Sequence, residues 1–244
     1  MMRLLLISNS GHPFLAHCRD AIADFLGSVR TVGYITAARL DDERVAFGKA
    51  RDALKDVGVA VEHLRLDSGF GARLAALPAV FVGGGNTYAL LSRLRRARAL
   101  PLLRRRVLLG MPYIGTSAGT NIAGPNMLAT NDWNVVGATR FDALGLVPFT
   151  INPHYRETDP VMAPHSETRD QRIVEYLNVN ANPVAGIEEE TALRIEGRRV
   201  AVVGSGRVKL FQRGRPPRWF DPGATLPPGC SPGGGSGKDG RDGH

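Results

Sequence analysis

The sequence predicts an α/β protein: a doubly wound, mostly parallel sheet with helices on both faces, followed by a β-rich C-terminal part. Short apolar runs alternate with amphipathic segments through the first half of the chain. This alternation is typical of parallel sheets, because consecutive parallel strands are joined by crossovers that usually contain a helix. In the second half the apolar runs follow one another more closely and are separated by turn residues, which favours antiparallel strands.

Each element is expected from its own pattern of apolar residues. In the first half, strands are expected at residues 4–8, 29–35, 59–64, 79–82 and 113–115. Helices are expected between them at residues 13–26, 42–57, 88–97 and 100–109. In the second half, a helix at 167–177 is expected among strands at 151–152, 184–187, 192–195, 200–203 and 208–212. Residues 196–199 are typical of a hairpin turn.

Residues 1–221 of the 244 are predicted to form one domain. From Pro222 onward the chain is mostly Gly, Pro, Ser and charged residues, so we expect a disordered tail at 222–244. The first residues favour a buried strand rather than a signal peptide. The two cysteines, Cys18 and Cys230, form neither a disulfide framework nor a metal site in the sequence, which favours a cytoplasmic location.

The formal net charge of +8 raises the question of a nucleic-acid partner. Much of the excess lies in arginines between Arg93 and Arg106, but this cluster lacks interleaved aromatic residues and any recognisable nucleic-acid module. We interpret it as a solvated helix face, and we expect no nucleic-acid partner. No apolar run approaches the length of a membrane span, so no membrane partner is expected.

The segment Gly115-Thr116-Ser117-Ala118-Gly119 follows the apolar run 111–114. Small residues on both sides of a serine between a strand and a helix fit a nucleophile elbow, a tight turn that exposes the serine hydroxyl. The N–H of the next residue then points toward the oxyanion that develops during acyl transfer. An inert turn can have the same pattern, so the assignment depends on a partner base.

His154 is the strongest candidate for that base, because Ile151-Asn152-Pro153 places it just after a short strand. A third residue must orient the imidazole and stabilise its charged form. Two candidates remain open here. One is a glutamate from the run Glu188-Glu189-Glu190 at the end of a strand, and the other is Asp132.

The loop Gly83-Gly84-Gly85-Asn86-Thr87 also lies between an expected strand and an expected helix. It matches neither common phosphate-binding pattern and contains no lysine. We interpret it as the source of a second oxyanion N–H, with Asn86 or Thr87 capping the helix.

Several of these segments together resemble the peptidase E family of α-aspartyl dipeptidases. The segments, in chain order, are 82–87, 113–119, 130–132, 141–144, 151–154 and 167–172. The resemblance extends from about Leu4 to Gln212. It implies a flavodoxin-like fold of the class I glutamine amidotransferase type and a serine peptidase that cleaves Asp-Xaa dipeptides without a metal or organic cofactor.

The resemblance also implies roles for particular residues. Ser117 corresponds to the nucleophile, His154 to the general base and acid, and Glu189 to the third member of the triad. Gly85 and Ala118 correspond to the donors of the oxyanion hole.

Two further positions correspond to family residues near the site. Asp132 matches an acidic position, and Arg169 is expected to bind the β-carboxylate of the substrate, because a guanidinium binds carboxylates through two parallel hydrogen bonds. The expected partner is a small dipeptide, and the chain is expected to be a monomer or a homodimer.

One residue departs from the pattern. Enteric members of the family have a tryptophan before the nucleophile, whereas this chain has Thr116, as in the related cyanophycinases. A cyanophycinase-like β-aspartyl peptidase or an esterase is therefore an alternative within the same reaction class. A catalytically idle binding module of the same fold is the alternative from another class.

Overall fold

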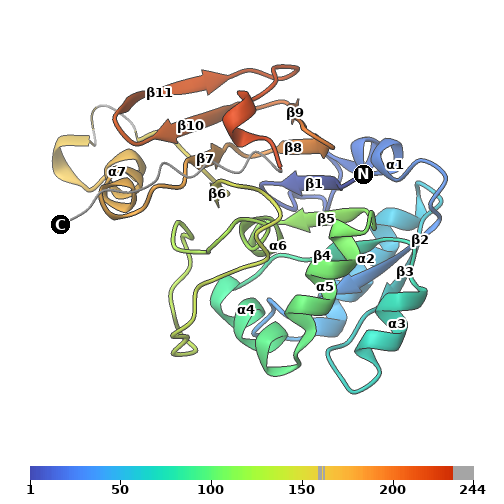
Figure 1. Cartoon of the computed structure of the whole chain (residues 1–244). Coiled ribbons are helices and arrows are strands. Elements are labelled where there is room, and N and C mark those ends of the chain that lie inside the picture. The colour runs from blue at the N-terminus through green and yellow to red at the C-terminus, as the bar shows by residue number, and fades with distance from the viewer. Residues whose placement is uncertain (159–160, 162, 233–244) are drawn as a thin grey trace, which may run out of the picture.

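A seven-stranded sheet forms the centre of the computed structural model, which describes residues 1–158, 161 and 163–232 (Figure 1). The strand order is β3-β2-β4-β5-β1-β8-β9. The first five strands in this order are parallel, and they are β1 (Arg3–Ile7), β2 (Thr31–Ile35), β3 (Ala60–His63), β4 (Val80–Val82) and β5 (Tyr113–Thr116). The hairpin of β8 (Thr191–Glu196) and β9 (Arg199–Gly204) adds two antiparallel strands beside β1.

Helices cover both faces of this sheet, because its parallel strands are apolar on both sides. On one face lie α1 (Arg19–Leu26) and α2 (Glu43–Lys55), which contribute Phe25 and Leu54 to one buried cluster. On the other face lie α3 (Phe70–Ala76), α4 (Thr87–Arg96) and α5 (Ala99–Leu108). Within the described residues, no helix combines the length and the apolar character that a membrane span requires.

A second sheet has the strand order β11-β10-β7-β6. Its strands are β6 (Thr150–Asn152), β7 (Val184–Ile187), β10 (Val208–Gln212) and β11 (Arg215–Phe220). The helix α7 (Arg169–Val179) packs against it through Ile173 and Tyr176. Ala185 and Leu210 of this sheet belong to the same buried cluster as Leu4 and Val82 of the large sheet. The two sheets therefore share one core.

The predicted α/β class is confirmed, with a large parallel sheet, helices and a β-rich C-terminal part. Three elements differ from expectation. The helix expected from residue 13 begins only at Arg19, since Leu15 adopts a left-handed φ of 59° that a helix cannot contain. The helix α3 was not predicted. Strand β11 was missed because it contains Pro216 and Pro217, which an edge strand tolerates.

Some arginines of the cluster between Arg93 and Arg106 form hydrogen bonds to backbone carbonyls, which was not expected. Arg93 donates to the carbonyls of Ala37 and Arg39, and Arg104 donates to the carbonyl of Leu144 at 2.8 Å. Arg106 donates to the carbonyls of Ala75 and Leu77 at the C-terminal end of α3. Several arginines of the cluster are exposed, as expected, but Arg93, Arg104 and Arg106 also satisfy backbone carbonyls that would otherwise lack partners.

The boundary of the expected tail is also corrected. Leu226 is 3% exposed and donates its N–H to the carbonyl of Val200, and Cys230 is fully buried in the short helix η2 (Pro228–Cys230). These apolar side chains bury enough surface to fix the segment to β9 despite its Gly and Pro content. Residues 233–244, the remainder of the expected tail, lie outside the described residues.

We expect Leu226→Ala to lower the free energy of unfolding by about 2–4 kcal/mol, because it removes a buried side chain and leaves a cavity. Leu109→Ala is the control, since Leu109 is 70% exposed and its truncation should cost less than about 0.5 kcal/mol. Urea denaturation followed by circular dichroism measures both. Equal midpoints for Leu226→Ala and the parent protein would contradict the packing of this segment.

Candidate active site

Ser117 lies in a strained turn at the carboxyl end of β5. Its backbone has φ 50° and ψ −109°, and it precedes the short helix α6 (Ala118–Asn121). This conformation is unfavourable for a residue with a side chain and persists only where the surroundings enforce it. The N–H of Ser117 donates to the carbonyl of Ile7 in β1, and Thr120 Oγ1 lies within 2.8 Å of the carbonyls of Ile7 and Gly115.

The turn is tight because two glycines allow backbone segments to touch. A Cβ at Gly119 would lie 2.1 Å from the carbonyl oxygen of Val82, and a Cβ at Gly115 would lie 2.7 Å from the backbone of Gly119. No side chain fits at either position without movement of the backbone. The predicted elbow is therefore built as the sequence pattern indicates, with α6 pressed against the ends of β4 and β5.

His154 comes from the other sheet, two residues after β6, and also has a left-handed φ of 55°. Its Nε2 lies 2.8 Å from Ser117 Oγ, and its Nδ1 lies 2.9 Å from Glu189 Oε1. The carboxylate can only accept, so Nδ1 carries the proton, and Nε2 accepts from the serine hydroxyl. These three side chains form a hydrogen-bonded series with the geometry that nucleophilic catalysis requires.

The three consecutive glutamates have three different partners. Glu188 Oε2 accepts the N–H of Arg207 at 2.8 Å, and Glu190 Oε2 accepts from Ser205 at 3.2 Å. Only Glu189 of the three is hydrogen-bonded to His154 among the described residues. The sequence left this choice open, and the turn that follows β7 resolves it by giving each glutamate a different partner.

Gly85 and Ala118 lie on either side of Ser117. Gly85 has φ 139°, and a Cβ there would lie 2.4 Å from the carbonyl oxygen of Ala38, so only glycine fits. That carbonyl accepts the N–H of Asn86 at 2.8 Å, which fixes the turn. Among the described residues, the N–H groups of Gly85 and Ala118 have no acceptor. Both are therefore free to donate to an oxyanion.

Asp132 and Arg169 line a different cavity from the one that Ser117 lines. Asp132 Oδ2 accepts from the N–H and the hydroxyl of Thr87 at 2.7 and 2.6 Å, at the start of α4. Asp132 and Arg169 line a cavity of about 570 Å³ that does not include Ser117 among its lining residues. Burial lowers the pKa of Arg169, which forms no hydrogen bond or ion pair with a described residue.

The segment around Asn152 separates the two cavities. Asn152 lines the cavity of Asp132, and His154 lines that of Ser117. Asn131 donates to the carbonyl of Pro153 at 2.8 Å, and Asn152 donates to Asn131 Oδ1 at 2.7 Å. The Thr-Asn-Asp and Asn-Pro-His motifs therefore interlock, which fixes the backbone on which His154 is carried.

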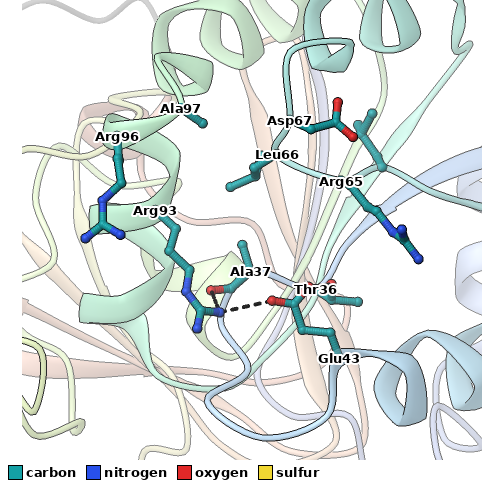
Figure 2. Close-up of a pocket in the computed structure, with 10 residues that line it drawn as sticks. Thr36, Ala37, Glu43, Arg65, Leu66, Asp67, Arg93, Arg96 and Ala97 are labelled. Atoms are coloured by element: carbon teal, nitrogen blue, oxygen red, sulfur yellow. Dashed lines mark hydrogen bonds and ion pairs between the residues drawn. The ribbon is translucent and has the colours of Figure 1, made fainter.

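The cavity that contains Ser117 measures about 370 Å³, near the lower end of the roughly 300–1,000 Å³ typical of small-molecule sites. A cavity of about 640 Å³ lies at the ends of β2 and β3, and Figure 2 shows Thr36, Arg65, Arg93 and Arg96 around it. This larger cavity contains none of the residues of the Ser-His-Glu series.

Ser8, at the end of β1, is a site residue that the sequence reasoning missed. Its buried hydroxyl accepts the N–H of His154 at 2.8 Å and donates to the carbonyl of Ile187 at 2.9 Å. One hydroxyl therefore connects the large sheet, the base and the strand that leads to Glu189. A serine at the end of a strand gives no sequence signal for such a contact.

The parallel sheet, the serine elbow and the base at a neighbouring strand end define the protein as a serine hydrolase on an α/β fold. The model of Peptidase family S51 matches residues 4–203. The chain therefore belongs to peptidase family S51 and is a serine peptidase.

Relatives of similar length support this assignment. The chain is 41% identical to peptidase E of Streptomyces coelicolor, over 92% of this chain and 93% of that protein. It is 39% identical to a probable alpha-aspartyl dipeptidase of Drosophila melanogaster, over 86% and 89% of the two chains. The resemblance stated from the motifs is confirmed.

Solved structures show the same architecture. A peptidase E-type protein from Listeria monocytogenes superposes with a TM-score of 0.68 at 26% identity, covering 84% of this chain and all of that one. A peptidase from an acI-B1 Actinobacterium superposes with a TM-score of 0.72 at 17% identity, covering 93% and 96%. At that identity the second likeness concerns the fold alone.

We expect Ser8→Ala to lower kcat by about 10- to 100-fold with little change in KM, because His154 loses the acceptor that fixes its backbone. The control is Ser28→Ala, at an exposed position between α1 and β2. Steady-state kinetics on an aspartyl dipeptide measures both variants. Wild-type kcat in Ser8→Ala would contradict the positioning role of this hydroxyl.

Proposed function

We propose that the protein is an α-aspartyl dipeptidase that hydrolyses Asp-Xaa dipeptides through Ser117, His154 and Glu189. The observation that supports this most directly is the unbroken series of hydrogen bonds from Ser117 Oγ to Glu189 Oε1. The printed names of the relatives, peptidase E and alpha-aspartyl dipeptidase, supply the substrate class. The free N–H groups beside Ser117 complete an acyl-transfer site.

The mechanism follows from this geometry. Ser117 Oγ attacks the carbonyl carbon of the aspartyl residue, while His154 Nε2 takes the hydroxyl proton and Glu189 stabilises the imidazolium. The N–H groups of Gly85 and Ala118 bind the oxyanion. His154 then gives the proton to the leaving amine, and the aspartyl ester of Ser117 forms. Water, deprotonated by His154, hydrolyses that ester and releases aspartate.

Asp132 takes a substrate-binding role in this proposal rather than the catalytic one that we expected from the sequence. Its carboxylate is bound to Thr87, next to the oxyanion turn, and Glu189 occupies the place beside the imidazole. We further propose that the aspartyl residue of the substrate extends past Asn152 toward the cavity of Asp132 and Arg169. There Arg169 binds the β-carboxylate, and Asp132 attracts the free α-ammonium group.

Three expectations from the sequence remain predictions within this proposal. They are the relationship to the class I glutamine amidotransferase fold, the cytoplasmic location and the choice between monomer and homodimer. The order of five parallel strands with helices on both faces supports the first of these.

We expect the protein to release free aspartate from Asp-Leu, and Ser117→Ala to abolish this activity. Glu189→Gln should lower kcat on the order of 10²- to 10⁴-fold, since the imidazole loses the carboxylate that orients and stabilises it. Glu188→Gln is the matched control, because its carboxylate bonds to Arg207 instead. We expect that variant to stay within about fivefold of the wild type.

Other substrates separate the alternatives in the same assay. Faster cleavage of β-aspartyl-leucine or β-aspartyl-arginine would favour a cyanophycinase-like enzyme, the alternative that Thr116 suggested. No turnover of any peptide or ester, together with failure of a fluorophosphonate to label Ser117, would contradict the peptidase and favour a binding module.

We expect Arg169→Gln to raise KM for Asp-Leu by about 10- to 100-fold, because the β-carboxylate loses a charged, two-pronged donor. Preference for Asp-Leu over Asn-Leu should fall by the same factor. Arg172→Gln is the control, since Arg172 lines the same cavity but is paired with Glu167 at 2.7 Å. An unchanged preference in Arg169→Gln would exclude Arg169 from β-carboxylate recognition.

A further inference from the structure

Two cations line the cavity of the nucleophile and have no part in the mechanism above. They are Arg39, on the loop after β2, and Lys49, in the middle of α2. Lys49 forms no hydrogen bond or ion pair with any described residue. Arg39 binds Asp41 through Nε and Nη2, which leaves its Nη1 edge without a partner among the described residues.

The charge of this cavity is unbalanced. Its charged lining residues are Arg39, Lys49 and Glu189, and Glu189 is already hydrogen-bonded to His154. The cavity of Asp132 and Arg169 contains side chains of both signs. An N-terminal aspartyl residue also carries both signs, an ammonium and a β-carboxylate. The residue that leaves a dipeptide has one free carboxylate, which matches the unpaired Lys49 and the Nη1 edge that Arg39 keeps free beside its ion pair with Asp41.

The wall of the same cavity suits the side chain of the leaving residue. Phe14, Val45 and Ala46 line it, and they present apolar surface that an aspartyl side chain would not use. A leucine side chain gains free energy by covering such a wall. The apolar wall and the two cations therefore belong to the leaving-residue side of Ser117.

Arg39 is held at a fixed distance from the oxyanion turn. Arg93 donates to the carbonyls of Ala37 and Arg39 and to Glu43 Oε1, and Figure 2 shows this arginine reaching Ala37 and Glu43. The residue between them, Ala38, accepts the N–H of Asn86 next to Gly85. The loop that carries Arg39 is thus attached on one side to α4 and on the other to the turn beside Ser117.

We propose that Lys49 and the Nη1 edge of Arg39 bind the free α-carboxylate of the leaving residue, and so restrict the enzyme to dipeptides. This inference rests on the proposed α-aspartyl dipeptidase. In a tripeptide the corresponding position holds a neutral peptide bond, and the carboxylate lies about 3.3–3.6 Å further along an extended chain. The cations then lose their partner, and binding weakens.

The test compares Asp-Leu with Asp-leucinamide, which has a neutral amide where the dipeptide has its carboxylate. Wild-type kcat/KM should be about 10-fold or more higher for Asp-Leu, mainly through KM, because a charge-assisted hydrogen bond to the carboxylate is lost in the amide. K49Q should reduce this preference to about twofold. R39Q should reduce it as well, and Lys55→Gln should keep the wild-type preference, since Lys55 ends the same helix outside the cavity.

An equal loss for both substrates in K49Q and R39Q would overturn the proposal, because the cations would then act on a part of the substrate other than the carboxylate. Equal wild-type kcat/KM for both substrates would overturn it as well. If the wild type cleaves neither substrate, the proposed dipeptidase fails first, and this inference falls with it.

Discussion

The contact between the helix after Ser117 and the ends of β4 and β5 is the constraint on which the site depends. Gly119 lies so close to Val82 that a Cβ would stand 2.1 Å from its carbonyl oxygen. This approach leaves no room for a relaxed turn and holds Ser117 at its left-handed φ. The strain exposes the hydroxyl and leaves the N–H of Ala118 free. The exposed hydroxyl and the free N–H are therefore two results of one close contact.

The other two members of the series reach Ser117 because the second sheet shares the core of the first. The ends of β6 and β7 carry His154 and Glu189, and the Ser8 hydroxyl at the end of β1 bonds to both segments. Carboxyl ends of strands from two sheets thus meet at one edge, as expected for ligand sites in open α/β folds. The interlocked Asn131 and Pro153 hold the base from the opposite direction.

The sequence predicted the features that depend on local backbone chemistry. The elbow, the glycine loop and the position of His154 after a strand all follow from turn residues at strand ends, and the structure places them as expected. Features set by long-range packing were not predictable. Ser8 has no local pattern, Leu226 was hidden in a segment of tail-like composition, and β11 was masked by its prolines. The sequence named Glu189 only through resemblance, since all three glutamates have the same chemistry.

In the proposed mechanism, specificity and catalysis are coupled through the loop that follows β2. Its Ala38 carbonyl fixes the turn of Gly85, the proposed oxyanion donor, while the next residue, Arg39, lines the cavity of Ser117. Arg93 holds both neighbours of Ala38 by their carbonyls. A shift of this loop would therefore move an oxyanion donor and a substrate cation together. Such coupling favours catalysis only when the peptide fills both sides of Ser117, because binding energy from the leaving residue then stabilises the geometry of the oxyanion turn.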